Sequence, residues 1–322
     1  MINIIGGAGF IGTRLAKVLN EHGTAFNIFD KALNGNNYCD VTQPDTLAAI
    51  PTADMIINLA AEHRDDVYPR TLYDSVNVDG ARNICNYCRD NNIQKIIFTS
   101  SVAVYGFAPE GTDEFGELNP FNDYGRSKIE AEAIYKEWLA EDQNQRTLVI
   151  IRPTVIFGEQ NRGNVYNLFN QIARKRFIML GSGSNRKSMA YVENVAEFLA
   201  FCINLDPGEH IYNYIDKPDL DMNSLVSHCR KVLFGKDNVG VRLPKWTGVI
   251  IGYIFDMVAL ASKRKLPVSS IRVKKFMETT AFNTSIAETG FKPKCDLLEG
   301  IERTLKYEFL QNNLGNKVFY TE

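Results

Sequence analysis

Three residues in the first half of the chain have the types and the spacing that proton transfer at a hydroxyl group requires. Tyr124 and Lys128 stand four residues apart at the start of a helical stretch, so both side chains lie on one face. A nearby ammonium stabilises a phenolate and lowers the pKa of the tyrosine, as a general acid and base needs. Ser101 ends an apolar run, 94–101, that predicts a strand, and a hydroxyl at that strand end can hydrogen-bond a substrate oxygen.

A glycine-rich turn near the start of the chain predicts a dinucleotide site. The apolar run 2–5 precedes Gly6-Gly-Ala-Gly9-Phe-Ile-Gly12, and an amphipathic stretch follows. This order indicates a buried strand, a tight turn and a helix whose N-terminus faces a pyrophosphate. A second apolar run ends in Asp30, where a carboxylate binds an adenosine ribose and repels a 2′-phosphate. We therefore expect NAD rather than NADP.

Strands and helices must alternate to position these residues. Further apolar runs lie at 54–61, 94–101 and 147–151, with helices expected at 69–90 and 123–141. Strands that are apolar along their whole length indicate a parallel sheet with both faces covered. We predict an α/β fold with a Rossmann-type doubly wound parallel sheet over 1–158 and a smaller, mixed α/β substrate-binding part over 159–322.

The second part has a looser pattern. Helices are expected at 163–175, 191–205, 221–234 and 295–310, and short strands near 177–180 and 210–214. The stretch 191–205 is expected to pack back on the sheet.

Composition restricts the class of protein. The 322 residues carry a net charge of −2 and are 45% hydrophobic, which allows a substantial core and does not indicate a nucleic-acid partner. Six scattered cysteines fit a reducing compartment, and Cys85-x-x-Cys88 lacks a second pair, so no metal is expected. The first strand begins at residue 2, which leaves no room for a signal peptide, and we expect a cytoplasmic location.

One apolar segment, 246–262, complicates this picture. It contains Asp256 and is short for a membrane span. We favour a helix that is buried or faces a partner, with association with a membrane surface as the alternative.

Seven ordered motifs resemble those of the NAD-dependent epimerase/dehydratase family of extended short-chain dehydrogenases/reductases. They are Gly6-x-x-Gly9-x-x-Gly12, Asn58-Leu-Ala-Ala61, Asn77-Val-Asp-Gly80, Ser100-Ser-Val-Ala-Val-Tyr-Gly106, Tyr124-Gly-Arg-Ser-Lys128, Arg152-Pro-Thr-Val-Ile-Phe-Gly158 and Tyr191-Val-Glu-Asn-Val195. The resemblance covers most of the chain and implies that Ser101, Tyr124 and Lys128 act with a nicotinamide. Tyr124 would exchange the hydroxyl proton while a hydride moves between a sugar carbon and the nicotinamide, and Lys128 would also bind the nicotinamide ribose.

The resemblance implies a wider set of NAD contacts. For Asn77 a purely structural role stays equally open, and Ser100 is the less favoured alternative to Ser101 as the catalytic hydroxyl. His63 and Arg64 stay open between substrate contact and a solvated loop. The expected cofactor-binding residues are Gly6, Gly9, Phe10, Ile11, Gly12, Asp30, Asp40, Val41, Leu59, Ala60, Ala61, Asn77, Ser100, Tyr124, Lys128, Pro153 and Val155.

Two basic loops in the second half, 161–167 and 181–187, indicate where a substrate diphosphate binds. They combine amides and glycines with cations, and charge-assisted hydrogen bonds suit a diphosphate. Relatives that act on sugar nucleotides have a basic residue at the position of Lys187, although they often have aspartate in place of Ser188. We expect Ser101, Asn164, Arg186 and Lys187 to contact a nucleotide sugar, with UDP favoured; ordinary surface charges are the alternative.

The choice of reaction depends on the residues after the catalytic serine. Dehydratases of the family have Asp-Glu there, whereas this chain has Val102 and Ala103, which cannot transfer a proton. Because Asp30 favours NAD, we predict C4 inversion of a UDP-sugar through a transient 4-keto intermediate, in polysaccharide biosynthesis. An NAD(P)H-dependent 4-keto-sugar reductase is the first alternative, and a 3β-hydroxysteroid-type or lipid alcohol dehydrogenase is the second. The family also implies a homodimer formed through the long helices.

Overall fold

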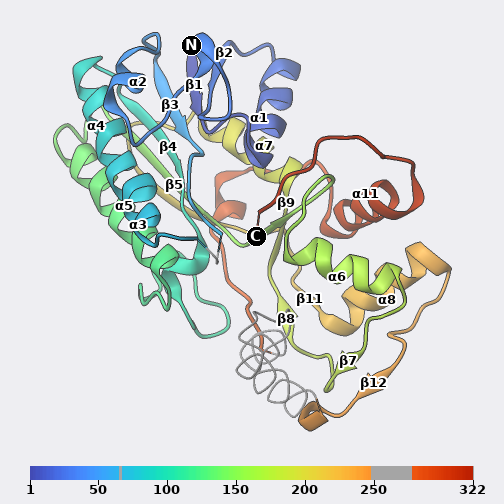
Figure 1. The fold of residues 1–322 in the computed structure, drawn as a ribbon. Coiled ribbons are helices and arrows are strands. Elements are labelled where there is room, and N and C mark those ends of the chain that lie inside the picture. Colours follow the sequence, from blue (N-terminus) through green and yellow to red (C-terminus); the bar gives the residue numbers. More distant parts are fainter. Residues whose placement is uncertain (65–66, 248–277, 322) are drawn as a thin grey trace.

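The main sheet of the protein is parallel and has helices on both faces (Figure 1). The computed structural model describes residues 1–64, 67–247 and 278–321. Within these residues the sheet has six strands in the order β10-β5-β4-β3-β1-β2. The strands are β1 (Ile2–Ile5), β2 (Phe26–Phe29), β3 (Met55–Asn58), β4 (Lys95–Thr99), β5 (Thr147–Pro153) and β10 (Gly208–Tyr214). The predicted Rossmann-type sheet is confirmed.

Two apolar layers join the helices to the sheet. On one face, α1 (Phe10–Glu21) packs against α7 (Val192–Cys202), and their apolar side chains share a cluster with β1. On the other face, α4 (Gly80–Asp90) packs against α5 (Asp123–Ala140), with the short α2 (Pro44–Ala48) beside α4. The helix expected at 69–90 begins with α3 (Thr71–Tyr73) and the π-helical turn η2 (Asp74–Asp79), which run directly into α4.

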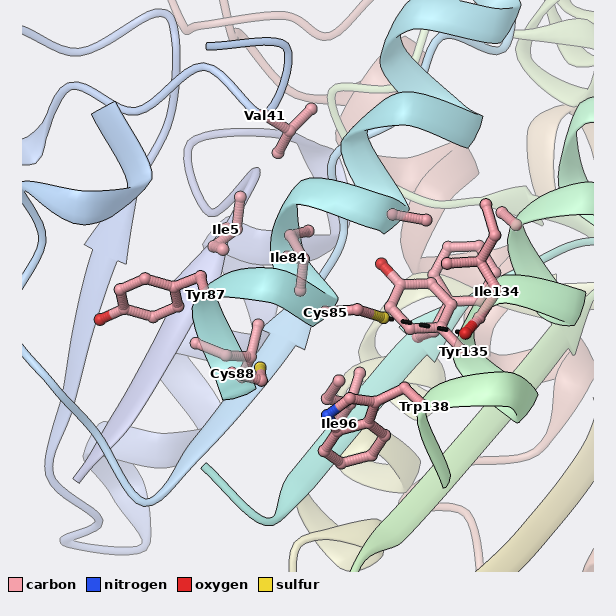
Figure 2. Close-up of a cluster of buried hydrophobic side chains, with 14 of the residues drawn as sticks. Ile5, Val41, Ile84, Cys85, Tyr87, Cys88, Ile96, Ile134, Tyr135 and Trp138 are labelled. Carbon is pink, nitrogen blue, oxygen red and sulfur yellow. Dashed lines mark hydrogen bonds between the residues drawn. The ribbon is translucent and has the colours of Figure 1, made fainter. Parts of the chain in front are cut away.

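The two cysteines of the Cys85-x-x-Cys88 pattern lie inside the second apolar layer. Figure 2 shows both side chains among Ile84, Ile134 and Trp138. Burial raises the pKa of Cys85 to about 12, and its thiol donates to the carbonyl oxygen of Ile134 at 3.9 Å. These thiols therefore pack as small apolar side chains.

The chain returns to the sheet after the smaller part has begun. α7 packs back on α1, as expected for 191–205. The sequence predicts the strand near 210–214 as part of the smaller part, but β10 pairs with β5 along its length and forms an edge of the main sheet. Because an edge strand is only partly covered, β10 mixes polar and apolar residues and does not resemble the inner strands.

The smaller part is built around one apolar cluster. α6 (Asn164–Ala173), α8 (Met222–Phe234) and α11 (Leu297–Leu310) contribute Phe169, Leu225 and Ile301 to it. Short strands pair around these helices: β6 (Val155–Phe157) with β9 (Met189–Tyr191), β8 (Arg186–Lys187) with β11 (Leu220–Asp221), and β7 (Met179–Leu180) with β12 (Arg242–Leu243). Strands of two or three residues are too short to show an alternating pattern in the sequence. Of these short strands, the sequence predicts only β7, within the strand expected near 177–180.

Most of the predicted segment 246–262 lies outside the described residues, since these stop at 247 and resume at 278. Among the helices that the structure describes, none combines the length and the apolar character needed to cross a bilayer.

A buried ion pair ties α5 to the carboxyl ends of β4 and β5. Arg152 at the end of β5 donates to the two carboxylate oxygens of Glu132 on α5, at 2.9 and 2.5 Å. Both side chains are almost fully buried, at 2% and 3% exposure. The Ser100 hydroxyl donates to the same carboxylate at 2.5 Å, and Arg152 also donates to the Tyr105 hydroxyl at 2.7 Å. Because burial opposes the charge of Arg152, its retention depends on Glu132.

Removing one partner should therefore be far more damaging than removing a surface charge. We expect Glu132→Ala to lower the free energy of unfolding by about 3 to 5 kcal/mol, because it leaves a buried guanidinium without its counter-ion. The control on the same helix is Glu130→Ala, which removes an exposed pair with Arg126 and should cost at most about 1 kcal/mol. Denaturant unfolding measures both, and equal losses would contradict the assigned role of the pair.

Candidate active site

A cavity of about 940 Å³ opens at the carboxyl ends of the main-sheet strands. Its volume is at the upper end of the range of about 300 to 1,000 Å³ for ligand pockets. The strand order reverses between β1 and β3, where sheets of this kind bind their ligands. The predicted site residues that line the cavity are Gly6, Gly9, Phe10, Ile11, Gly12, Asp30, Asp40, Val41, Leu59, Ala60, Ala61, Ser100, Ser101, Tyr124, Lys128, Pro153, Val155, Asn164 and Lys187. Asn77 and Arg186 are not among the lining residues.

The glycine turn has the geometry that a dinucleotide diphosphate needs. Gly6 has a φ of +78°, and a Cβ there would lie 2.5 Å from the backbone nitrogen of Ala60, so only glycine fits. Gly9 caps α1 without a side chain over the first turn, and that turn contains no acidic residue. The N-terminal N–H groups of α1 thus remain available for an anion. These residues fit NAD.

Asp30 follows β2 and borders the same turn. Its carboxylate accepts hydrogen bonds from the backbone nitrogens of Ala8 at 3.1 Å and Ala32 at 2.9 Å. The side chain therefore holds the glycine turn against the end of β2 while it lines the cavity. Lys31 lines the cavity beside it.

Ser101, Tyr124 and Lys128 meet at the other end of the cavity. Ser101 caps the 3₁₀ turn η3 (Val102–Tyr105), where its hydroxyl accepts from the backbone nitrogen of Ala103 at 3.1 Å, and its side chain also acts to lower the pKa of Tyr124. The first turn of α5 lies close to this 3₁₀ turn because it contains Gly125. A Cβ at this position would lie 2.5 Å from the carbonyl oxygen of Ala103 and would push the helix away. A glycine at this position is therefore part of what positions the tyrosine.

Burial has opposite effects on the proton affinities of the two ionisable groups. It raises the pKa of Tyr124 to about 12, although the hydrogen bond from Ser101 opposes this rise. It lowers the pKa of Lys128 to about 7, although the charge of Glu132 opposes this fall. The Lys128 ammonium donates to the carbonyl oxygen of Thr99 at 2.9 Å and lies 5.9 Å from the centre of the Tyr124 ring. The pKa of Tyr124 is therefore raised, not lowered as the nearby Lys128 predicts, because desolvation dominates at both groups.

The structure distinguishes the two adjacent serines. The Ser100 hydroxyl is buried and donates to Glu132, whereas the Ser101 side chain is close enough to Tyr124 to act to lower its pKa. Only Ser101 is therefore placed to share a substrate oxygen with the tyrosine, which keeps it as our candidate.

Asn77 lies in η2 and is 3% exposed. Its side-chain oxygen accepts from the backbone nitrogen of Glu62, and its side-chain nitrogen donates to the Glu62 carbonyl and the Ser127 hydroxyl, each at 2.9 Å. These bonds tie the loop after β3 to α5. Asn77 therefore acts on the site through the position of the neighbouring backbone.

The basic residues expected to bind the substrate diphosphate are separated in space. Lys187 on β8 lines the cavity, donates to the carbonyl oxygen of Glu278 at 2.6 Å, and has its pKa lowered by burial to about 8. Arg186 precedes it on the same short strand and is exposed. Successive strand residues point to opposite sides, so only Lys187 faces the cavity. Ser188 also lines the cavity, and its hydroxyl donates to Asp219 at 2.6 Å.

Several lining residues were not predicted. They come from segments far apart in the sequence; Thr154 and Asn161 lie within the predicted motif 152–158 and loop 161–167, and no predicted motif or loop contains the others. Of the two residues left open after β3, His63 lines the cavity, while Arg64 pairs with Glu62 at 3.3 Å. The additional residues include Phe107, Phe121, Thr154, Asn161, Glu278, Thr280, Phe282, Val318, Phe319, Tyr320 and Thr321.

The parallel sheet, the glycine turn and the enclosed tyrosine and lysine together define an NAD-dependent enzyme of the extended short-chain dehydrogenase/reductase type. The model of the NAD dependent epimerase/dehydratase family matches residues 2–214, and the chain belongs to this family.

Two curated relatives and one solved structure are similar over nearly the whole chain. An N-acetyl-alpha-D-glucosaminyl-diphospho-ditrans,octacis-undecaprenol 4-epimerase of Escherichia coli O157:H7 is 44% identical over 99% of this chain and 98% of its own length. A UDP-glucose 4-epimerase of Vibrio cholerae is 25% identical over 97% of this chain and 96% of its own. The structure of the Thermus thermophilus UDP-glucose 4-epimerase in complex with NAD superposes with a TM-score of 0.71 at 19% identity, covering 95% of this chain and 98% of that one. The predicted family, NAD dependence and epimerase class are confirmed.

The buried ammonium of Lys128 should make the folded protein less stable than an apolar side chain of similar length would at the same position. Its folded-state pKa of about 7 lies below the ordinary 10.5, so folding disfavours the protonated amine. We expect Lys128→Met to raise the free energy of unfolding below about pH 7 and to lose this advantage as the pH approaches about 10, where the unfolded chain also releases the proton. Denaturant unfolding at several pH values checks this, with the exposed Lys136→Met on the same helix as control. A pH-independent gain would be inconsistent with a buried charge.

Asp30 should determine the choice of cofactor through its charge. We expect Asp30→Asn to retain the hydrogen bond from Ala8 and to reduce the preference for NAD over NADP on the order of tenfold, about 1.4 kcal/mol. Removal of the carboxylate ends repulsion of a 2′-phosphate and leaves the cation of Lys31 at the cavity. Titration with NADH and NADPH measures the ratio, and an unchanged ratio would argue against the ribose contact.

Proposed function

We propose that the protein inverts C4 of an N-acetylhexosamine carried on a polyprenyl diphosphate. The observation that carries this proposal is the 44% identity, over essentially both whole chains, to an epimerase whose name specifies such a substrate. The relative named for a UDP-sugar is only 25% identical over a similar length.

The residues at the sugar end of the cavity suit the two proton transfers of this reaction. NAD held at the glycine turn by Gly6, Gly9 and Gly12 would supply the nicotinamide for reversible hydride transfer at C4. Tyr124 takes the proton of the C4 hydroxyl, while Ser101 donates a hydrogen bond to the same oxygen. A protonated Lys128 beside the tyrosine favours the phenolate.

Inversion also requires the keto sugar to present its other face before reduction, because the groups that exchange hydride and proton are fixed in place. Val102, Ala103, Phe107 and Phe121 line this end of the cavity with apolar surface. Apolar walls form no hydrogen bonds that would hold the ring in one orientation. Val102 and Ala103 also offer no acid or base for the elimination of water.

The diphosphate has a matching position in the smaller part. Lys187 lines the cavity, and α6 begins at Asn164 after Gly163, with both residues at the cavity wall. A buried cation and helix N–H groups favour an anion. An anion beside Lys187 would in turn raise its pKa above about 8 and keep it charged.

A UDP-sugar is the second candidate substrate. It shares the diphosphate and the sugar with the polyprenyl compound, and both the Vibrio cholerae and the Thermus thermophilus relatives are named for one. These two candidates differ only beyond the diphosphate, so they share the roles of Tyr124 and Lys187.

Product analysis separates the candidates. Purified protein is incubated with NAD and either detergent-solubilised polyprenyl-diphosphate-linked N-acetylglucosamine or UDP-N-acetylglucosamine, and the released sugars are resolved by chromatography. We expect conversion of the lipid-linked sugar to its C4 epimer without net NADH, and a loss of about 10²- to 10⁴-fold in rate for Tyr124→Phe. Conversion of the UDP-sugar alone would replace the proposed carrier by UDP, and activity only as a reductase of added 4-keto sugar would overturn the epimerase.

A further inference from the structure

Residues 317–321 form a wall of the active-site cavity although they are far from every motif in the sequence. Val318, Phe319, Tyr320 and Thr321 line the cavity. In Figure 1 this segment leads to the end marked C, at the centre of the molecule beside β9. The segment also lies outside residues 2–214, which the family model matches. The family model therefore does not cover it.

One side of segment 317–321 is bound to the loop after β6. The backbone nitrogen of Phe319 donates to the carbonyl oxygen of Gln160 at 2.9 Å, and the backbone nitrogen of Arg162 donates to the carbonyl oxygen of Phe319 at 2.8 Å. The Thr321 hydroxyl donates to the side-chain oxygen of Asn161 at 3.2 Å. The two backbone bonds form an isolated parallel β-bridge between Asn161 and Phe319, which attaches the segment to the loop after β6.

The other side of the segment contacts the glycine turn and the start of α1. The Phe319 ring lies 5.7 Å from the Phe10 ring, and the Arg14 guanidinium lies 4.9 Å from the centre of Phe10 and 5.3 Å from that of Phe319. The Lys317 ammonium donates to the carbonyl oxygen of Ala8 at 3.1 Å. Segment 317–321 therefore joins the smaller part to the turn that faces the cofactor diphosphate.

A buried hydrogen-bond donor beside the segment has no partner among the described residues. The side-chain nitrogen of Asn161 is buried and unbonded, and the residue is 3% exposed. Its side-chain oxygen already accepts from the Gly163 nitrogen at 2.6 Å and from Thr321, which determines the orientation of the amide. Since Asn161 lines the cavity, the remaining N–H groups are available to a ligand there.

We propose that segment 317–321 is part of the NAD site: it closes over the cofactor diphosphate at the glycine turn and slows release of the cofactor. Phe319 and Lys317 hold the segment on the turn, and Thr321 orients Asn161 as a hydrogen-bond donor to the bound ligand. Slow release matters for the proposed epimerase, because the reduced cofactor must stay in place until the keto sugar is reduced again. Binding of the cofactor itself is measured without any sugar and so does not depend on which substrate is correct.

The experiment measures cofactor release from the full-length protein. NADH is bound, then displaced by excess NAD in a stopped-flow instrument, and the change in NADH fluorescence gives the release rate. We expect Phe319→Ala to speed release about tenfold, because it loses the ring contact to Phe10 and the burial that accompanies it. Lys317→Ala should speed release by a smaller factor, because the hydrogen bond that it removes, from the Lys317 ammonium to the carbonyl oxygen of Ala8, is exposed to solvent.

Two surface variants are matched controls. Leu314→Ala truncates a side chain that is 91% exposed, and Lys306→Ala removes an ammonium paired with Glu302 on the outside of α11. Thermal melting of all variants shows whether each is folded; if Phe319→Ala is not, Lys317→Ala decides. Release rates of the folded variants equal to those of the controls would overturn the proposal.

Asn161→Asp tests the donor separately. It retains an acceptor for Gly163 and Thr321 but replaces the free N–H groups by a negative charge. We expect weaker NADH binding and faster release. Unchanged affinity for NADH would remove Asn161 from the cofactor site.

Discussion

The bidentate pair between Glu132 and Arg152 is the contact on which the geometry of the active site depends. Glu132 lies on α5, one helical turn after Lys128 and two turns after Tyr124, so its position sets the depth of both side chains. Arg152 lies on β5, and the same carboxylate receives the hydroxyl of Ser100, next to Ser101. The pair thus joins the helix that provides the acid and base to the strand end that provides the hydroxyl. Because the pair is buried and both oxygens of the carboxylate accept hydrogen bonds, a small shift of α5 relative to β5 would leave a buried polar group without a partner.

Electrostatics in the site follow from the same enclosure. Burial disfavours both a phenolate at Tyr124 and an ammonium at Lys128, and it moves their pKa values to about 12 and about 7. A positive charge or a hydrogen-bonding hydroxyl near Tyr124 offsets the desolvation of the phenolate, so groups that bind there lower the pKa of the tyrosine.

The parts of the molecule that sequence reasoning predicted well are those where local order carries the information. Gly6, Gly9 and Gly12 sit between a buried strand and an amphipathic helix, and that order alone predicted a turn that lines the cavity. The position of Ser101 at a strand end and the four-residue spacing of Tyr124 and Lys128 likewise predicted residues that line this cavity. Nineteen of the predicted contacts line one cavity, which is what placement at the carboxyl ends of adjacent strands requires.

Other features could not be read from the chain because they depend on tertiary partners. Arg186 and Lys187 are neighbours in sequence, but strand pairing sends them to opposite sides. The side chain of Asn77 forms hydrogen bonds to the Glu62 backbone and the Ser127 hydroxyl. No spacing in the sequence predicts these partners. The pKa of Tyr124 was predicted from its cation alone, whereas the extent of burial is known only once the surrounding helices are in place. Phe319 enters the site from nearly two hundred residues after Tyr124, with no motif around it.

The return of the chain to the main sheet bears on how the protein folds. β5 is buried on every residue, and one of its two edges is covered only by β10, which follows more than fifty residues later. Until β10 arrives, that edge exposes unpaired backbone groups beside an apolar surface, a combination that invites pairing with another chain. Because α6 and the short strands lie between β5 and β10 in the sequence, the sheet is complete only after these elements. A fragment that ends at residue 158 would lack β10 and would leave this edge of β5 without its partner strand.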